Sequence, residues 1–400
     1  MTELFSKYCF ILGSRKQVNY LVYIRQNNGN CVNGLADRGI LLKRWLKVYI
    51  CVIFPFCGVS HLRNPFANPF ARFVLKKAVF YGIVAFVAVT FVFFIPRLMP
   101  GNPIDRLIPR QTATPGVDWQ KIRENMLSYY GFDRPLLEQY ISFWGQILRG
   151  DLGITVTILP GKSVAEIVAW KLPFTLALAL PILIISFLLG NWIGAKAAYM
   201  GGKLSDLIYF ISVFSNRLPS FWLGMVLVYI FAVRLGIFPP YGWITAEIIP
   251  GWNFATFQSI LWHYCLPFIS LFIVYLGGWA TGMRSMVVHE MDSGYVRYAE
   301  ALGFRRKKVQ SYTQRNAILP QFTGLNLYLS ALIGETTVIE AVFGWPGVGD
   351  LMYRAVVSGP DYPLIFGSFL VIMVVVIFGN FLIDILYGLV DPRIRIGGRL

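Results

Sequence analysis

The feature that most constrains this chain is a series of long apolar segments separated by charged stretches. A helix needs about 20 mostly apolar residues to cross the hydrocarbon core of a bilayer. Only 14% of the residues are charged, against about 25% in soluble domains. The sequence therefore predicts an all-α integral membrane protein with about six transmembrane helices. The predicted spans are residues 78–95, 172–195, 207–233, 264–283, 319–342 and 364–389.

The third predicted span is unusual because residues 216–219, with the sequence NRLP, interrupt it. A proline removes a helical hydrogen bond, and neighbouring helices compensate for that loss inside a bundle. We therefore expect one span that is broken near its middle.

Lysine and arginine residues are concentrated on one side of the predicted spans. Seven lie between residues 284 and 315 and three in the C-terminal tail, whereas the loops 236–262 and 343–363 carry only Arg354. Basic loops stay on the cytoplasmic side of a membrane. The pattern predicts that the loop 285–318 and the C-terminus are cytoplasmic. It also explains the net charge of +16, so we predict contact with membrane lipid and no nucleic-acid partner.

Residues 97–170 form the longest polar stretch between two predicted spans, with acidic and basic side chains mixed evenly. Long loops cross a membrane regardless of their charge. We therefore expect an extracytoplasmic cap between the first two transmembrane helices. Residues 136–148 have amphipathic helical spacing and end before Gly150, which predicts a short helix within this cap.

The first 65 residues differ from the rest of the chain, since they are polar, rich in Asn and Cys, and without clear periodicity. An apolar stretch at 48–59 is interrupted by Pro55, so it is either an interfacial segment or an additional helix. We expect a poorly defined N-terminal extension at 1–65 and a transmembrane domain at 66–400. The five cysteines are interpreted as free thiols because their spacings match no zinc pattern.

Motifs with catalytic or metal-binding chemistry are incomplete in this chain. Residues 161–163 (GKS) resemble part of a phosphate-binding loop, but Val156 stands where that loop needs a glycine. Residues 289–290 (HE) begin a zinc-protease pattern, but Ser293 stands where the second histidine is needed. The sequence therefore predicts no catalytic residues, no metal site, no cofactor and no enzyme activity.

The inner loop is the most informative segment of the chain. Residues 295–303 suit a short amphipathic helix with Gly303 as its C-terminal stop, and residues 316–320 lead back into the membrane. A short helix lying across the cytoplasmic face presents a rigid surface to a partner. The alternative interpretation is an interfacial loop that only orients the bundle.

Nine short motifs occur in one order along residues 73–396, and together they resemble the binding-protein-dependent ABC importer permeases of the dipeptide, oligopeptide and nickel branch. Each motif is weak alone, but the ordered set is specific. The motifs are 98–103 (LMPGNP), 134–140 (RPLLEQY), 148–153 (LRGDLG), 218–224 (LPSFWLG), 284–286 (RSM), 299–303 (AEALG) with 315–317 (RNA) and Pro320, 340–349 (EAVFGWPGVG), 361–363 (DYP) and 391–395 (DPRIR).

The resemblance implies the ABC importer permease fold in a cell membrane and a set of protein partners. These are a second, homologous permease that forms a heterodimer with this chain, two cytoplasmic ABC ATPase subunits, and an extracytoplasmic solute-binding protein. The chain would form half of the translocation pathway, with ATP hydrolysed by the separate subunits. Peptides are the expected cargo and oligosaccharides the alternative, while the three histidines give no sign of nickel handling.

The resemblance also implies that the short inner helix docks on an ATPase subunit and transmits closure driven by ATP to the membrane helices. Glu300 to Leu302 depart from the basic residue that often precedes the glycine in this family. The predicted coupling residues are Tyr295, Arg297, Ala299, Glu300, Ala301, Gly303, Arg315 and Pro320.

Polar residues inside the predicted spans are costly in a membrane, so they line a pathway or pair with one another. We select Arg217, Asn326 and Glu335 as candidates for the translocation path. Glu335 stands where the family has a small residue. It either faces the path, pairs within the bundle, or reaches a helix end. Asp384 is interpreted as an inner-end residue near the arginines of the C-terminal tail.

Two other classes of protein stand as alternatives. A stand-alone secondary transporter or channel would have internal repeats and an ion site at the membrane midplane, and the sequence shows neither. A membrane enzyme would need a catalytic constellation facing one side of the bilayer, and none is complete.

Overall fold

The computed structural model describes residues 21–25, 31–35, 69–98, 134–358 and 361–390. The chain divides into two compact units, Met1–Asn68 and Pro69–Leu400. In the first unit, β1 (Leu21–Arg25) pairs antiparallel with β2 (Cys31–Leu35), and Leu21 lies opposite Leu35. The apolar stretch at 48–59 lies outside the described residues.

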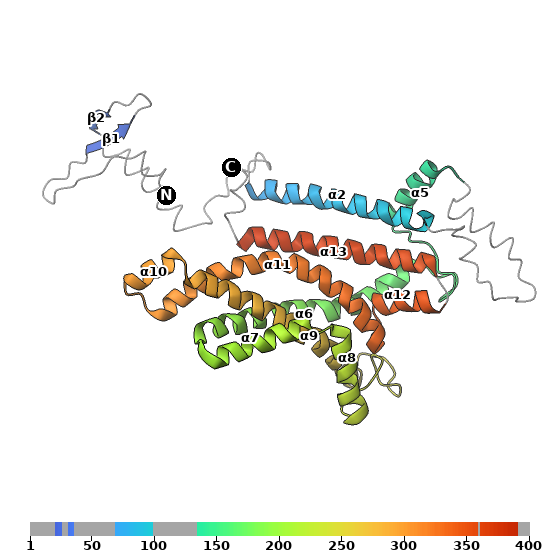
Figure 1. Ribbon diagram of the computed structural model, residues 1–400. Coiled ribbons are helices and arrows are strands. Elements are labelled where there is room, and N and C mark those ends of the chain that lie inside the picture. Colours follow the sequence, from blue (N-terminus) through green and yellow to red (C-terminus); the bar gives the residue numbers. More distant parts are fainter. Residues whose placement is uncertain (1–20, 26–30, 36–68, 99–133, 359–360, 391–400) are drawn as a thin grey trace, which may run out of the picture. The chain divides into compact units, whose positions relative to one another are not determined.

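The second unit is built from helices (Figure 1). Five of the described helices are long and apolar enough to cross a membrane, and the count is six if one bent pair forms a single span. The prediction of an all-α membrane fold with about six spans is therefore confirmed. The helices are α2 (Pro69–Leu98), α5 (Leu136–Leu148), α6 (Val164–Met200), α7 (Gly202–Arg217), α8 (Ser220–Leu227), η2 (Val228–Arg234), α9 (Phe254–Met291), α10 (Gly294–Ala301), α11 (Arg306–Phe343), α12 (Val348–Val357) and α13 (Tyr362–Val390).

Several helices extend beyond the apolar segments that predicted them. α6 begins at Val164, α9 at Phe254 and α11 at Arg306, which is eight to thirteen residues before the predicted starts at 172, 264 and 319. The predicted loop 236–262 is therefore shorter than expected. A helix can begin before its apolar segment where a side chain caps its first turn. At α9, the Asn253 side chain is such a cap, because it accepts a hydrogen bond from the Thr256 N–H at 2.7 Å.

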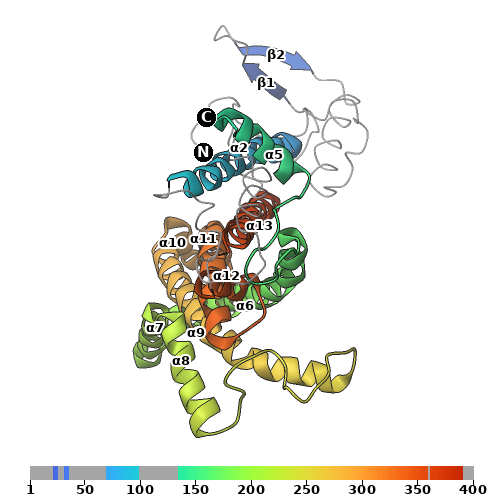
Figure 2. The same ribbon diagram turned by 90° about the vertical axis from the view of Figure 1, so that its right-hand side faces the viewer.

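The predicted break in the third span is present, but the two halves do not form one straight span. α7 and the α8–η2 segment are bent by 98°. Leu218 has an extended backbone, with φ −74° and ψ 133°, because the residue before a proline is pushed out of the helical region. Pro219 then precedes the first turn of α8. Figure 2 shows α8 extending away from the other helices of the unit.

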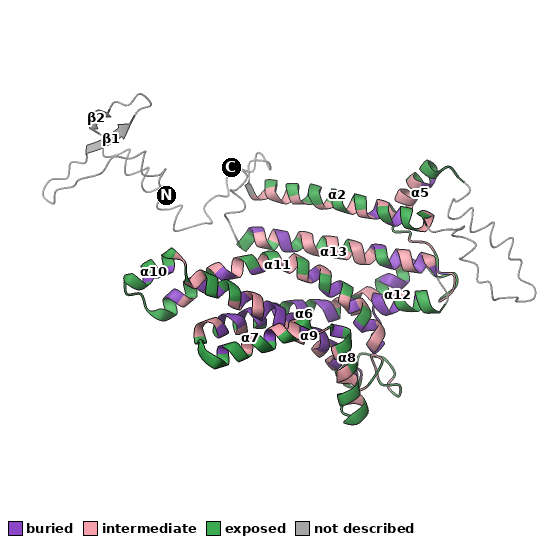
Figure 3. Cartoon of the chain, viewed as in Figure 1, coloured by how far each residue is buried: buried purple, intermediate pink, exposed green. Residues whose placement is uncertain are grey.

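The core of the unit lies where α6, α9 and α11 pack together. Two glycines on α6 permit close approach: a Cβ at Gly190 would lie 2.5 Å from the Trp279 Cβ, and one at Gly194 would overlap the main chain of Ala280. Buried residues gather on these helices, whereas α2 is mostly exposed or half-buried (Figure 3). An exposed apolar surface such as that of α2 suits contact with lipid. The core includes Leu178, Ile182, Leu266, Leu271, Trp279 and Leu332.

The connecting helices mark two opposite ends of the bundle. α10 lies at one end, and α12 lies at the other (Figure 1). The loop predicted at 343–363 therefore contains a helix that sequence reasoning did not expect, whereas α5 has the predicted bounds of 136–148.

Candidate functional site

α10 presents one face to the bundle and one to solvent. Val296 and Ala299 are buried and pack with Val309 of α11 in a small apolar cluster. On the opposite face, Tyr298 is 67% exposed, and Leu302 just after the helix is 56% exposed. Gly303 follows with φ +74°, a conformation that glycine adopts without steric cost, and a Cβ there would meet nothing within 4 Å. The predicted helix and its glycine stop are therefore both present.

The predicted coupling residues divide into three groups. Ala299 is buried, so it positions α10 and offers no contact surface. Tyr295, Arg297, Glu300, Ala301 and Gly303 are exposed together on or beside α10. Arg315 and Pro320 lie within α11, with Pro320 roughly four turns past its start.

Tyr295 is held against the end of α9. Its hydroxyl donates a hydrogen bond to Glu290 Oε2 at 2.6 Å. Burial and this hydrogen bond raise the pKa of Tyr295 above its usual value, so the hydroxyl stays protonated and keeps its donor. The contact fixes the start of α10 relative to α9.

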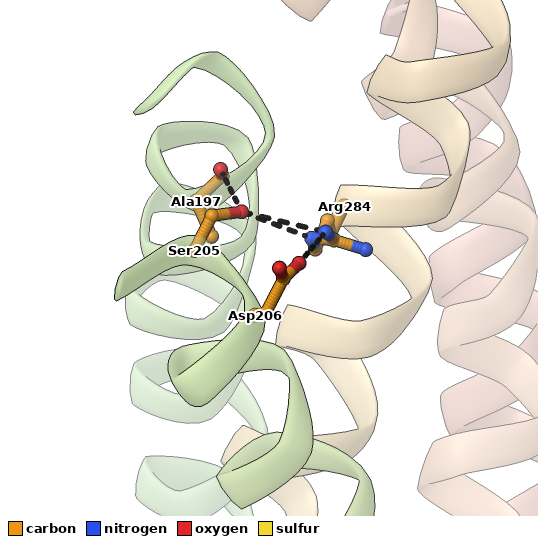
Figure 4. A network of polar contacts seen from close by, with 4 residues as sticks. All are labelled: Ala197, Ser205, Asp206 and Arg284. Atoms are coloured by element: carbon orange, nitrogen blue, oxygen red, sulfur yellow. Dashed lines mark hydrogen bonds and ion pairs between the residues drawn. The ribbon is translucent and has the colours of Figure 1, made fainter. Parts of the chain in front are cut away.

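A polar network joins the helices at the α10 end of the bundle (Figure 4). The Arg284 guanidinium on α9 donates to Asp206 Oδ1 at 3.1 Å and to Ser205 Oγ at 3.4 Å, both on α7. Ser205 Oγ in turn donates to the main-chain oxygen of Ala197 on α6 at 2.6 Å. Three membrane helices are thus tied together at the end of the bundle where α10 lies.

A second tie joins α6 to the first turns of α11. The Tyr199 hydroxyl donates to the main-chain oxygen of Gln310 and lies 2.7 Å from Thr313 Oγ1. Because α10 packs on α11 through Val309, movement of α10 would act directly on a helix that is hydrogen-bonded to α6.

The path candidates do not form one cluster. Asn326 Nδ2 donates to Asp384 Oδ1 at 2.7 Å, and Asp384 Oδ2 forms an ion pair with Lys77 at 2.7 Å and accepts from the Tyr81 hydroxyl at 2.9 Å. Asn326 therefore belongs to a network that ties α11 to α13 and α2. The tail arginines proposed as neighbours of Asp384 lie outside the described residues.

Arg217 and Glu335 are placed differently from Asn326. Arg217 is exposed at the end of α7, beside the bend. Glu335 is half-buried on α11, and its Oε2 has no hydrogen-bond partner among the described residues. Asn326 and Glu335 are nine residues apart, so they point to opposite sides of the helix.

Sequence reasoning missed the role of Glu340 at the α12 end. This side chain is fully buried, and its Oε2 accepts hydrogen bonds from the N–H of Gly349 at 2.6 Å and of Asp350 at 3.3 Å. A Cβ at Gly347 would overlap the Glu340 carboxyl group. The chain reaches this geometry through Gly344, whose φ is +63°. The glycine-rich motif 340–349 was the available signal, because such spacing marks close backbone approach.

Asp361 has a similar role at the same end. It is fully buried, and its Oδ2 accepts from the N–H groups of Val156 and Thr157, both at 2.9 Å. Its Oδ1 accepts from the Leu364 N–H at 3.3 Å in the first turn of α13. The aspartate thus joins the loop before α6 to the start of α13.

Arg354 places one charged group at the surface of α12. Arg354 donates from Nε to Asp350 Oδ2 at 2.8 Å and from Nη2 to the Tyr241 hydroxyl at 3.2 Å. The hydrogen bond to Asp350 raises the pKa of Arg354 further above neutrality. Across the part of the chain that the structure describes, no three His, Cys, Asp or Glu side chains are grouped so as to hold a metal ion.

Comparison with known proteins gives consistent likenesses. Residues 186–396 match a family model described as "Binding-protein-dependent transport system inner membrane component". The chain is 32% identical over 307 residues to the oligopeptide transport system permease protein AppB of Bacillus subtilis, covering 76% of this chain and 92% of that protein.

Two further relatives align over a similar number of residues. The di/tripeptide transport system permease protein DppB of Pseudomonas aeruginosa is 30% identical over 329 residues, covering 78% of this chain and 96% of that protein. The probable D,D-dipeptide transport system permease protein DdpB of Escherichia coli is 30% identical over 337 residues, covering 80% and 96%.

Proposed function

Because this chain belongs to the family of binding-protein-dependent transport system inner membrane components, we propose that it forms half of the translocation pathway of an ATP-driven peptide importer. The chain is a membrane-embedded permease subunit, and its relatives are transport subunits rather than enzymes. The peptide cargo is supported by the names of the relatives, which specify oligopeptides, di- and tripeptides, and D,D-dipeptides. Oligosaccharides, the alternative cargo, have no comparable support.

We place the α10 end of the bundle in the cytoplasm of a cell whose cytoplasmic membrane holds the protein. Basic side chains at membrane-helix ends favour the cytoplasmic side, and this end carries many of them. The end of α13 lies at the same end, so the C-terminus is also cytoplasmic in this proposal. The exposed basic residues there are Lys196, Lys203, Arg297, Arg305, Arg306, Lys307, Lys308 and Arg315.

The observation that carries the proposal is the two-faced α10. Its buried face fixes it to α11, and its exposed face offers Tyr298 and Leu302, large side chains of the kind that anchor protein interfaces. A cytoplasmic ATPase subunit that binds this face and closes on ATP would move α10 together with α11. Two such ATPase subunits are proposed, one on this chain and one on a second, homologous permease.

The opposite end is proposed to receive the solute-binding protein. α5 and the exposed face of α12 lie there, within the predicted cap 97–170 and loop 343–363. Arg354 is half-exposed on α12 and offers a charged contact. The rigid packing around Glu340 and Asp361 would hold this surface in a fixed shape.

The proposal is tested by reconstituting the chain with its partner permease, ATPases and binding protein in liposomes and measuring uptake of a labelled tripeptide. Uptake should need ATP, the ATPase subunits and the binding protein. Uptake by the chain alone would instead support a stand-alone secondary transporter or channel. Labelling of a cysteine at Tyr298 from the external side of intact cells would contradict the proposed orientation.

The coupling role is tested by Gly303→Val. A β-branched residue is strained at φ +74°, so the turn between α10 and α11 must change, although no atom blocks the new side chain. We expect ATP-dependent uptake to fall about tenfold or more while the complex still assembles. Gly236→Val is the matched control, because Gly236 also follows a helix, has φ +62° and has open space around it. Equal uptake by the two variants would contradict the coupling role.

A further inference from the structure

Glu335 lies at the edge of an open surface on α11. Leu332, Ile333 and Thr336 on one side of it are buried in the bundle. On the other side, Ala331, Gly334 and Val338 form an exposed stripe. A methyl group at Gly334 would meet nothing within 4 Å, so the surface beside Glu335 is not covered by the described part of the chain.

The Glu335 carboxylate has neither a hydrogen-bond donor nor a cation beside it in the described part of the chain. Its Oε2 is buried and accepts no hydrogen bond, and no ion pair to Glu335 is found among the described residues. The Tyr275 hydroxyl is also buried with no hydrogen-bond partner in the described part of the chain, and it interacts electrostatically with the Glu335 carboxylate. A charged group within a membrane is costly unless a cation or donors accompany it. Glu340, five residues later, has such donors and Glu335 does not.

Aromatic and amide groups lie near Glu335 and Tyr275, along the same side of α11. Tyr328 is seven residues before Glu335, so both lie on one face of the helix. Its ring lies 5.7 Å from that of Tyr275 and stacks on Trp279 at 4.0 Å. The Tyr328 hydroxyl and Asn216 Oδ1 converge over Gly278, where a Cβ would lie 2.5 and 2.7 Å from them. A carboxylate with hydroxyl, amide and aromatic faces nearby is the chemistry that recognises an ammonium group.

We propose that Glu335, with Tyr275 and Tyr328, forms a recognition site for an ammonium group of a peptide in the translocation path. The inference rests on the proposed peptide-import function and deepens it. The ammonium is either the free α-amino group of the peptide or a lysine side chain. Both bind through the same charge-assisted contact to the Glu335 carboxylate.

The first experiment measures uptake by the complete reconstituted importer for Glu335→Gln and the wild type. The substrates are trialanine, N-acetyl-trialanine and N-acetyl-Ala-Lys-Ala, each supplied at equal saturation of the binding protein, whose affinity for each is measured separately. A lost charge-assisted contact should lower trialanine uptake by about tenfold, with Glu335→Asp retaining more activity. N-acetyl-trialanine uptake should be unchanged, and the lysine peptide shows whether a side-chain ammonium also uses the site.

Glu166→Gln is the control for loss of a membrane-helix carboxylate, since Glu166 is exposed near the start of α6. An equal fall for all three peptides in Glu335→Gln, or no fall for trialanine, overturns the inference and leaves the proposed function standing. Absence of any peptide uptake by the wild-type complex counts against the proposed function itself.

The second experiment does not depend on transport. In a chain whose native cysteines are replaced, Ala331→Cys should react faster with a cationic than with an anionic methanethiosulfonate reagent, by about tenfold. Adding Glu335→Gln should remove the preference. Leu332→Cys, on the buried side, should be unreactive. An unreactive Ala331→Cys overturns the inference, because the surface beside Glu335 would then be closed to a peptide. A reactive Ala331→Cys without a preference for the cationic reagent also overturns it, because a cation from the partner permease would then neutralise Glu335.

Discussion

The two ends of the helix bundle are built in different ways. At the α12 end, the carboxylates of Glu340 and Asp361 are fully buried and bound by main-chain N–H groups. At the α10 end, the ion pair of Arg284 and Asp206 is partly exposed, and a three-residue apolar cluster together with the exposed Tyr295–Glu290 hydrogen bond holds α10 in place. Buried carboxylates bonded to main-chain N–H groups fix one geometry, whereas an exposed helix on a small cluster moves at little cost. The first end is therefore held in one shape, whereas the second can adjust to the proposed ATPase subunit.

The largest expected effect is that of Gly347→Ala, which tests whether the α12 end is fixed in one geometry. The new Cβ would overlap the buried Glu340 carboxyl group, so the turn and the hydrogen bonds to α12 must shift. We expect a loss of about 3 kcal/mol in the free energy of unfolding. Thermal unfolding of the purified protein in detergent measures it. Gly334→Ala on the same region of chain is the control, because nothing lies near that position. Equal melting temperatures would show that the α12 end tolerates movement.

A smaller effect is expected for Asp361→Ala. The change leaves the N–H groups of Val156 and Thr157 buried without their acceptor. We expect a loss of about 2 kcal/mol, measured by the same thermal unfolding. Asp151→Ala is the control, since Asp151 is exposed and accepts a single bond from the Gly153 N–H at 3.0 Å. If both aspartates prove equally dispensable, burial is not what distinguishes the α12 end.

The smallest effect on stability is expected for Tyr298→Ala on α10. The side chain is 67% exposed, so its removal should change the free energy of unfolding by less than about 0.5 kcal/mol. ATP-dependent uptake should nevertheless fall, because the exposed face is proposed to bind the ATPase. Melting and uptake are measured on one preparation, with Phe210→Ala, also 67% exposed but on α7, as the control. Unchanged uptake in Tyr298→Ala would contradict the proposal that the exposed face of α10 binds the ATPase.

Much of this architecture follows from local patterns in the sequence. Apolar length identified the membrane helices, amphipathic spacing gave α5 its bounds, and Pro219 and Gly303 marked a break and a stop. These signals are local because main-chain geometry acts over a few residues. The positions at which α6, α9 and α11 begin were missed because polar and charged residues interrupt the apolar pattern between these starts and the predicted ones at 172, 264 and 319.

The residues that were missed, and the partners of those that were selected, depend on contacts between distant parts of the chain. Asp384 pairs with Lys77 of α2, and no local pattern relates those two positions. In the sequence, Glu340 is only one residue of a glycine-rich motif. Its role depends on the N–H groups at the start of α12, which the fold brings onto its carboxylate. Asn326 was selected as a path residue by polarity alone, but it is bound to Asp384. Polarity within a span thus indicates that a partner exists, without saying which one.

α11 runs without interruption from Arg306 beside α10 to Phe343 before α12. Its 38 residues make a helix about 57 Å long. Val309, which packs against α10, the half-buried Glu335 and the buried Glu340 therefore all lie on one helix, which continues through Pro320. A tilt of about 10° around its middle would displace the two tips by about 5 Å in opposite directions. Access on one side of the membrane would then widen by the same movement that narrows it on the other.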